Sequence, residues 1–484
     1  MAKRKMSTFE RLNTGQMNRS QRRKLGDRVA TSDPGLTIVH CNAGGIDVGN
    51  ESHFVAVPPD RDANPVREFG CWTAALKQMS EWLQSCRIDT VAMQATGVYW
   101  IALYDVLEQH GIRVVLVNAQ HTKNVPGRKT DVQECQWLMK LHTYGLLRDS
   151  FRLQQDMEYV RTIWRVRDRH VQEAGRTVQH MQKALTKMNV QLANVISDIS
   201  GVSGQAIITA IVEGERDPYK LAALADYRIK ASREEVARSL EGNWRADVLF
   251  ELQQAVDSYH FAHRQMQECD EKLERYLASL PTRMLDIPAA STSAPQTAAQ
   301  KRKKAKKPRD NEPRMDLKGE VQRICGVDLT SIDGINVMTA FTVISEVGTD
   351  MSRFQDEDHF TSWMGLAPSK DISSRKVVGR GKKKVKNRVA VILRTAATTL
   401  LQSDTHLGAR YRHLRRQLPA FQIAVKAMAR YLAVLIYRLL THGHAWVDRG
   451  AAQFERRRIE RELASLHFKA RARGFTLVPI AAAC

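Results

Sequence analysis

The stretch GIDVGNESHFVAV, residues 45–57, decides the predicted fold of the N-terminal part of the chain. Two runs of β-branched and aromatic residues flank the turn-forming pair Gly49 and Asn50, which is typical of two strands joined by a tight turn. A third strand-like run, VREFGCW, follows at residues 66–72. The three adjacent runs predict an antiparallel meander.

Helical and strand-like patterns alternate after the meander. Helices are expected at residues 73–85, 99–110 and 132–144, with strands at DTVAMQA (89–95) and RVVLVNA (113–119). Such alternation indicates parallel strands with helices packed against the sheet. A meander continued by parallel strands is the RNase H-like arrangement, so we predict an α/β domain of this kind at residues 35–150.

Two long helices dominate the prediction for residues 151–286. Apolar residues recur at alternating spacings of three and four within residues 155–190 and again within residues 246–280, which is the pattern of a coiled-coil seam. The simplest pairing of the two helices is an antiparallel hairpin. Pairing between protomers is the alternative, and it would make this region a dimerisation surface.

The other segments differ in composition. Residues 1–34 carry nine Lys or Arg and three acids, which predicts a basic flexible arm. Residues 287–318, with the run KRKKAKKPR, are expected to be a basic linker, followed by a mostly helical C-terminal domain (319–450) and a basic helical tail (451–484). Within the C-terminal domain, LTSIDGINVMTA (329–340) predicts a helix-hairpin-helix that turns at Gly334.

Net charge narrows the class of protein. The chain has 74 Lys and Arg against 52 Asp and Glu, a surplus of +22 in 484 residues. A surplus of this size favours a polyanionic partner, most often nucleic acid. No run of 18 apolar residues and no apolar signal core occur, and the seven cysteines include no CxxC pair. We therefore expect no membrane segment, zinc ribbon or disulfide framework, and a reducing compartment.

Four positions predict an acidic metal site. Asp47 lies on the first strand, Gln94 ends a later strand, and Asp131 and Glu134 share one face at the start of a helix. In an RNase H-like fold, carboxylates that converge from separate strand ends hold two Mg²⁺ ions for polynucleotide cleavage or strand transfer. Taken singly, each acid is more simply a turn or cap residue, so the order and spacing together carry the prediction.

Two basic segments accompany these positions. Lys123, Arg128 and Lys129 precede Asp131, where they would contact the scissile phosphate or balance the acids. The second segment holds eight Lys or Arg in fourteen residues and no acid: Arg375, Lys376, Arg380, Lys382, Lys383, Lys384, Lys386 and Arg388. A hydroxyl of the adjacent Ser373 or Ser374 is a candidate nucleophile in this cationic field, although a basic loop with turn-forming serines has the same composition.

The chain resembles the DEDD-type insertion-sequence transposases from about Gly45 to Glu460. The N-terminal half of the resemblance rests on GIDVGNESHFVAV, AMQATGVYW (92–100) and LVNAQHTKNVPGRKTDVQECQWLMKLHTYGLL (116–147). The C-terminal half rests on DLTSIDGINVMTAFTVISEVGTDMSRF (328–354) and HFTSWMGLAPSKDISSRKVV (359–378). Members of this family are RuvC-like, serine-containing recombinases guided by a bridge RNA.

The resemblance implies catalytic roles for five residues: Asp47, Gln94, Asp131, Glu134 and Ser373. Asp47, Asp131 and Glu134 would be the Mg²⁺ ligands. Gln94 replaces the usual Glu of the family, Glu134 is one methylene longer than the common Asp, and Ser374 and Arg375 replace two glycines. Because an amide oxygen carries no negative charge, Gln94 is expected to weaken a site for two Mg²⁺ ions.

The resemblance also implies what the protein does. It would be a transposase or recombinase that cuts and rejoins DNA through a transient phosphoserine link, with an element-encoded guide RNA. Active sites would be composite, shared between protomers of a homodimer or homotetramer in the bacterial cytoplasm, in association with the nucleoid. Two alternatives stay open: a non-catalytic nucleic-acid-binding relative, and a metal-dependent nuclease or junction resolvase in which Ser373 has no part.

Overall fold

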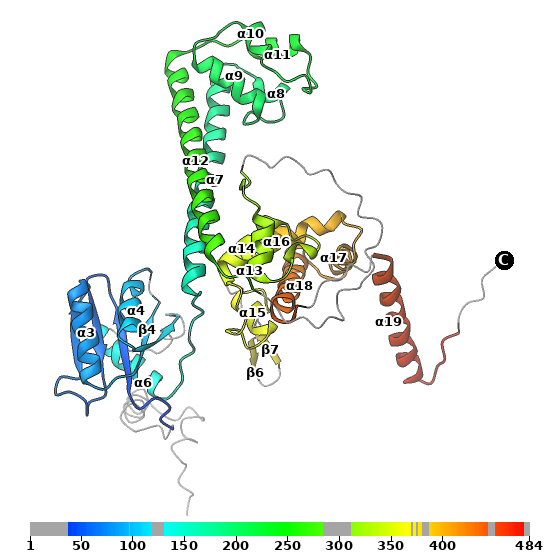
Figure 1. Ribbon diagram of the computed structural model, residues 1–484. Helices are drawn as coiled ribbons and strands as arrows, with labels where there is room; N and C mark the ends of the chain where they lie inside the picture. The colour runs from blue at the N-terminus through cyan, green and yellow to red at the C-terminus, as the bar shows by residue number, and fades with distance from the viewer. Residues whose placement is uncertain are drawn as a thin grey trace, which may run out of the picture. The chain divides into compact units, whose positions relative to one another are not determined.

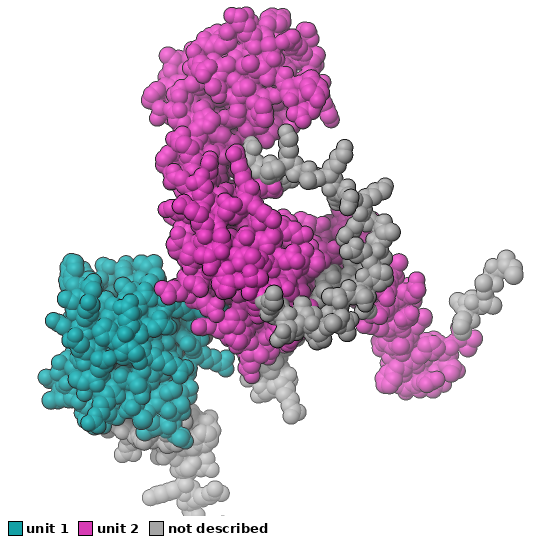
Figure 2. Space-filling view, in the orientation of Figure 1, with its two compact units in different colours: residues 1–152 teal, residues 153–484 magenta. Residues whose placement is uncertain are grey.

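The computed structural model describes eight stretches of the chain: residues 37–95, 97–118, 130–283, 311–368, 371–373, 376–379, 387–443 and 451–478. The chain forms two compact units, residues 1–152 and residues 153–484 (Figure 2). Each unit is described separately below.

A five-stranded mixed sheet organises the first unit (Figure 1). Its order is β3 (Val66–Gly70), β2 (Ser52–Ala56), β1 (Ala43–Val48), β4 (Thr90–Gln94) and β5 (Arg113–Val117). The first three strands pair antiparallel, and β4 and β5 continue the sheet parallel to β1. The predicted meander followed by parallel strands is therefore confirmed, and the three expected helices lie within one residue of their expected bounds.

The two faces of the sheet carry different helices. Helices α3 (Thr73–Ser85) and α4 (Trp100–Gln109) cover one face, where Ile46 and Met93 are fully buried in the main core of the unit. Helix α6 (Asp131–Thr143) covers the other face. Because side chains alternate along a strand, Asp47 and Gln94 belong to the face that α6 covers.

Gly45 allows α6 to lie directly against β1. A Cβ atom at this position would be 2.2 Å from the carbonyl oxygen of Cys135 and 2.3 Å from the amide nitrogen of Met139. Both contacts are with helix backbone, which no side-chain rotation can relieve. The absence of a side chain at residue 45 thus sets the distance between the helix and the strand.

An antiparallel hairpin of two long helices, α7 (Gln155–Lys187) and α12 (Ala246–Ser279), dominates the second unit (Figure 1). Lys187 pairs with Glu251 at one end of the hairpin, with 2.6 Å between Nζ and Oε2. At the other end the rings of Tyr159 and Tyr276 are in contact, with 4.1 Å between their centres. The predicted seam residues are buried or partly buried between the helices. Pairing within one chain is thus observed, while the coiled coil and the pairing between protomers remain predictions.

Four short helices close the hairpin between α7 and α12. They are α8 (Leu192–Val195), α9 (Val202–Val212), α10 (Pro218–Ala222) and α11 (Arg233–Ser239). Their buried apolar residues join those of α7 and α12 in one core.

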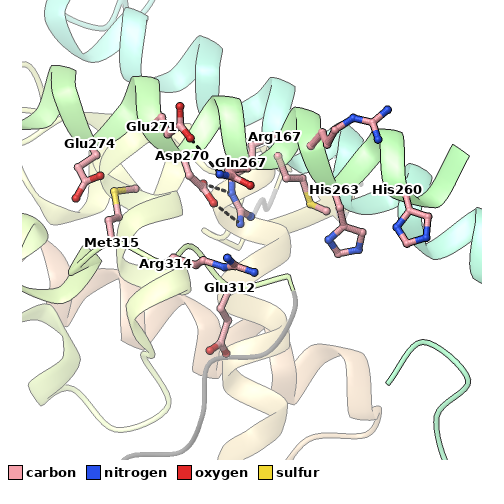
Figure 3. A pocket seen from close by; sticks show the side chains of 12 residues that line it. Arg167, His260, His263, Gln267, Asp270, Glu271, Glu274, Glu312, Arg314 and Met315 are labelled. Carbon is pink, nitrogen blue, oxygen red and sulfur yellow. Dashed lines mark hydrogen bonds and ion pairs between the residues drawn. The ribbon is translucent and has the colours of Figure 1, made fainter. Parts of the chain in front are cut away.

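A buried ion pair ties the hairpin to the segment that follows it. Arg167 on α7 is only 2% exposed and donates to both carboxylate oxygens of Asp270 on α12, at 2.5 and 3.2 Å (Figure 3). The same guanidinium donates to the carbonyl oxygen of Asn311 at 3.1 Å. Since a buried charge must be paired to be tolerated, these bonds fix the approach of residue 311 to the hairpin.

The C-terminal part of the second unit is mostly helical. Its elements are α13 (Leu317–Cys325), η2 (Leu329–Ser331), α14 (Val337–Val347), α15 (Glu357–Trp363), the two-stranded sheet of β6 (Asp371–Ser373) and β7 (Lys376–Gly379), α16 (Arg388–Thr399), η3 (Leu400–Gln402), α17 (His406–Gln417), α18 (Phe421–His442) and α19 (Ala451–Arg471). Helix α14 lies in the core, with every residue from Thr339 to Val347 buried.

The expected helix-hairpin-helix is not confirmed. The segment before Gly334 forms only the short 3₁₀ turn η2 rather than the apolar helix that was predicted. The carboxylate of Asp328 accepts hydrogen bonds from the amide and the hydroxyl of Thr330, at 2.9 and 2.5 Å. Such side-chain bonding to the backbone favours a local turn over helix continuation. Gly334 itself has φ of 85°, as expected for the turn.

Some predictions fall on parts of the chain that the structure does not describe. The basic arm at residues 1–34 and most of the basic linker at residues 287–318 lie outside the described residues. Across the eight described stretches, no helix combines the length and the apolar character that crossing a lipid bilayer demands.

Substituting Gly45 tests the contact between α6 and β1. We expect Gly45→Ala to lower the free energy of unfolding by about 3 kcal/mol, because the new methyl group would overlap helix backbone. Chemical denaturation of the full chain measures this loss. The control is Gly70→Ala on β3, where the nearest atom to a Cβ is a side-chain carbon of Trp72 at 3.4 Å. Equal losses in the two variants would contradict the proposed role of Gly45.

Candidate acidic site and serine segment

Two predicted site residues lie side by side where the inner strands β1 and β4 end, at the edge of the sheet formed by the carboxyl ends of its parallel strands. Ile46 on β1 is in register with Met93 on β4, so the next residues along these parallel strands, Asp47 and Gln94, are neighbours. Gln94 is only 3% exposed, whereas Asp47 is partly exposed. The carboxyl ends of two parallel strands thus present a carboxylate and an amide next to each other.

Helix α6 brings the other two predicted residues to this edge. Thr130 precedes the helix, and its hydroxyl accepts a hydrogen bond from the amide of Gln133 at 3.4 Å. The cap starts the helix so that Asp131 and Glu134 both fall in its first turn, where the helix dipole favours negative charge. Glu134 Oε1 accepts a short hydrogen bond from Gln94 Nε2, which joins the helix to β4.

Negative charge accumulates around Asp47. Its pKa is raised from the usual 3.8 to about 6, first by burial and then by the charges of Glu134 and Asp131. A hydrogen bond from the backbone amide of Val48 offsets part of this rise. The structure therefore brings Asp47, Asp131 and Glu134 close enough to repel one another, and a cation placed among them would relieve that repulsion.

The donor set suits a hard divalent cation, although its ligands are not gathered into a closed cage. Carboxylate and amide oxygens are the atoms that Mg²⁺ prefers. Among the residues that the structure describes, no three His, Cys, Asp or Glu side chains form a group that could hold a metal ion. Mg²⁺ commonly takes only one or two carboxylates and completes its shell with water and phosphate oxygens, so Asp47 and Glu134 fit the role of such ligands.

A thiol beside the acidic site is structural. Cys135 follows Glu134, is fully buried under the sheet, and donates from Sγ to the carbonyl oxygen of Val132 at 3.1 Å. Burial raises the pKa of the Cys135 thiol to about 12. The thiolate is therefore not formed near neutral pH, and Cys135 is no candidate nucleophile.

The first basic segment cannot be placed. Lys123, Arg128 and Lys129 lie outside the described residues, so their contact with phosphate stays a prediction.

The candidate serine lies at the end of a short strand. Ser373 closes β6 and stands in register with Lys376, the first residue of β7. The backbones of these two residues are described, but Ser374 and six of the predicted cations are not: Arg375, Arg380, Lys382, Lys383, Lys384 and Lys386. The structure thus places Ser373 beside one predicted basic residue, and the rest of the cationic field remains a prediction.

Arg388 has a different setting from the one predicted. Its guanidinium ion-pairs with Asp168 on α7, at 2.5 Å between Nη2 and Oδ2, and with Glu346 on α14, at 3.4 Å between Nε and Oε1. Glu346 also accepts two hydrogen bonds from Arg165. Arg388 is therefore engaged in holding the start of α16 against the hairpin, and contact with nucleic acid would have to compete with these pairs.

Two residues that shape the site were not singled out from the sequence. Gly45 admits α6 to the sheet, and Thr130 starts the helix at the turn that carries the acids. The Gly44–Gly45 pair inside a strand pattern was a signal of close backbone approach. Thr130, placed directly before Asp131, was a signal of a helix cap.

Two family models match the chain. The model of the IS110-type DEDD transposases, described as a transposase, matches residues 44–190, which include Asp47, Gln94, Asp131 and Glu134. The model of the IS116/IS110/IS902 family of transposases matches residues 328–412, which include Ser373. A search of curated proteins found no significant match. Both models come from one kind of transposase and match in the order of the acidic site and the serine segment, so the chain belongs to the IS110 family of DEDD transposases.

Proposed function

We propose that this insertion-sequence transposase cuts and rejoins DNA with a Mg²⁺-dependent acidic site and a serine nucleophile. The observation that carries the proposal is the convergence of Asp47, Gln94 and Glu134 at one sheet edge, where burial and neighbouring charge raise the pKa of Asp47. Families of this kind typically depend on a divalent metal, and the oxygen donors of this site suit one.

The acidic residues would have distinct tasks. Asp47 and Glu134 would bind the cation, and Asp131, exposed in the first turn of α6, would add a third carboxylate or orient a bound water. Gln94 would hold Glu134 in place through its amide hydrogen bond and would offer its own carbonyl oxygen to the cation. Mg²⁺ ions bound by these groups, two in the full site, would polarise the phosphate and stabilise the leaving oxygen.

Ser373 would form the covalent link to DNA. Its Oγ would attack the scissile phosphorus, the bond from phosphorus to the leaving DNA oxygen would break, and the serine proton would be lost while that oxygen gains one. A DNA hydroxyl would then attack the phosphoserine, which reseals a strand and restores the serine. Because one phosphodiester bond is formed for each one broken, the exchange needs no external energy source.

The partners would be DNA, a guide RNA encoded by the element, and further copies of the chain. A surplus of +22 supports two nucleic-acid partners, since each phosphate brings one negative charge. The acidic site and Ser373 fall in different compact units, which is compatible with active sites shared between protomers of a homodimer or homotetramer.

One observation favours a second candidate, a nucleic-acid-binding relative with impaired chemistry. The amide of Gln94 brings no charge to the site and donates its hydrogen to an oxygen of Glu134 that a metal ion would otherwise use. Binding of a divalent cation would then have to displace this hydrogen bond. Such a protein would keep its steeply salt-dependent affinity for nucleic acid but would break no strand.

Replacing the candidate nucleophile separates these functions. The wild-type protein, incubated with element ends, Mg²⁺ and the element's RNA, should form a protein–DNA adduct that survives denaturing electrophoresis. Ser373→Ala should abolish the adduct, because the ester oxygen is gone, while Ser374→Ala is the matched control and should keep it. Wild-type joining by Ser373→Ala would eliminate the assignment. Strand cleavage without any adduct would support a metal-only nuclease, and binding without cleavage would support the impaired relative.

Restoring the carboxylate at position 94 tests the metal site. Without Mg²⁺, Gln94→Glu should lower the free energy of unfolding by about 1–3 kcal/mol, because a buried carboxylate replaces the amide that donates to Glu134. With Mg²⁺, the rise in melting temperature should exceed that of wild type, and the joining rate should stay equal or increase. The control is Gln136→Glu, which places the same charge at an exposed position of α6. A clear fall in joining rate would refute the ligand role of position 94.

The raised pKa of Asp47 predicts a pH-dependent stability. The folded state holds this proton more tightly than the unfolded state, so protonation stabilises the fold at low pH and that contribution is lost as pH rises from about 4 through 6. Asp47→Asn should therefore raise the melting temperature more at pH 8 than at pH 5, with a chelator present. Asp60→Asn, an exposed carboxylate of the same unit, should shift it equally at both pH values. Equal shifts for Asp47→Asn at the two pH values would show that the pKa of its carboxyl group is not raised.

A further inference from the structure

A groove lies between α16 and α18 in the second unit. It has a volume of about 470 Å³, and six polar or aromatic residues line it: Arg394, Thr395, Thr398, Phe421, Gln422 and Lys426. Ile423 and the buried Val425 supply the remaining apolar surface. No Asp or Glu is among the lining residues, so the charges of the groove are positive only.

The surrounding helices are strongly cationic. Residues 387–443 contain nine Lys or Arg and a single acid, Asp404. Three of the cations, Arg388, Arg430 and Arg438, form ion pairs with acids from elsewhere in the unit. Arg394 and Lys426 form no ion pair with any residue of the described stretches, although Arg394 Nε donates to the carbonyl oxygen of Ala390 at 3.1 Å. Their charge is therefore available to an anionic ligand.

An exposed aromatic ring stands at the end of the groove. Phe421, the first residue of α18, is 47% exposed. The guanidinium of Arg415 on α17 lies over one face of its ring, 4.9 Å from the ring centre, so a base would stack on the opposite face. Ile423 is exposed as well. A flat aromatic face bordered by cations is the combination by which proteins hold unpaired nucleotides, since bases stack on the ring and phosphates meet the cations.

We propose that this groove binds an unpaired stretch of polynucleotide, with a base stacked on Phe421 and phosphates on Arg394 and Lys426. The inference rests on the proposed function, which brings DNA and a guide RNA to the chain but does not say which surface holds them. Positive charge without any acid in the lining favours this ligand over an apolar protein segment. A base pair inside a duplex is already stacked on both faces, so the ring selects unpaired bases.

The test measures binding of fluorescent oligonucleotides of about 12 residues to the full chain by anisotropy. A single-stranded RNA, a single-stranded DNA of the same sequence and the blunt DNA duplex are compared. Phe421→Ala should weaken single-strand binding by about 5- to 100-fold and duplex binding by less than about 2-fold. Phe421→Tyr should restore it. Phe250→Ala removes another exposed ring, 67% exposed on α12, and should change nothing.

The cations are tested by salt dependence. Arg394→Ala and Lys426→Ala should each flatten the slope of log affinity against log salt concentration for the single strand by about 0.7, as for one lost phosphate contact. The preference between the RNA and DNA oligonucleotides identifies which strand the groove takes. Unchanged affinity of Phe421→Ala for both single strands would overturn the proposal, as would an equal loss for the duplex, which would indicate mere phosphate contact.

Failure of the groove proposal can be distinguished from failure of the proposed function. If wild type forms no DNA adduct but binding depends on Phe421, the proposed function fails and the groove stands. If the adduct forms and binding ignores Phe421, the groove fails and the proposed function stands. Thermal melting of each variant confirms that an exposed ring was removed without unfolding.

Discussion

The contact between α6 and β1 at Gly45 is the constraint on which the acidic site depends. Only a residue without a side chain lets the helix backbone approach the strand so closely. That approach carries the first turn of α6, with Asp131 and Glu134, to the strand end that bears Asp47. The packing that stabilises the unit therefore also buries Asp47 and brings negative charge close to it, and both effects raise the pKa of its carboxyl group.

Gln94 lowers the charge repulsion within the acidic site. An amide at this buried position donates to Glu134 and adds no charge, so the cation-free site carries three carboxylates instead of four. Without a cation, the fold with an amide at position 94 is under less charge repulsion than a fold with a carboxylate there. The attraction of such a site for a divalent cation would also be weaker. If the proposed metal site exists, the amide would thus favour a stable scaffold at the expense of tight metal binding, which is a common opposition at functional sites.

Sequence patterns predicted the elements well and the long-range contacts poorly. Apolar periodicity and turn residues act locally, so the helix at residues 73–85 and the succession of strands and helices along the chain were readable. The spacing of Asp131 and Glu134 likewise predicted their shared turn. The hydrogen bond from Gln94 to Glu134 and the ion pair of Arg388 with Asp168 join residues far apart in sequence, and no local pattern encodes them. The turn led by Asp328 was missed because side-chain capping competed with a helical apolar pattern.

Ion pairing separates two uses of the positive charge in the C-terminal helices. Some cations form ion pairs with acids on other helices and so stabilise packing within the chain: Arg388, Arg430 and Arg438. Arg394 and Lys426 stand beside an exposed Phe421 in a groove without acids, where packing gives no reason for unbalanced charge. Uncompensated cations destabilise a compact fold by mutual repulsion unless a ligand supplies the missing negative charge. The positive charge that points to a ligand is therefore the charge of individual cations without an acidic partner, such as Arg394 and Lys426, rather than the net charge of the whole chain.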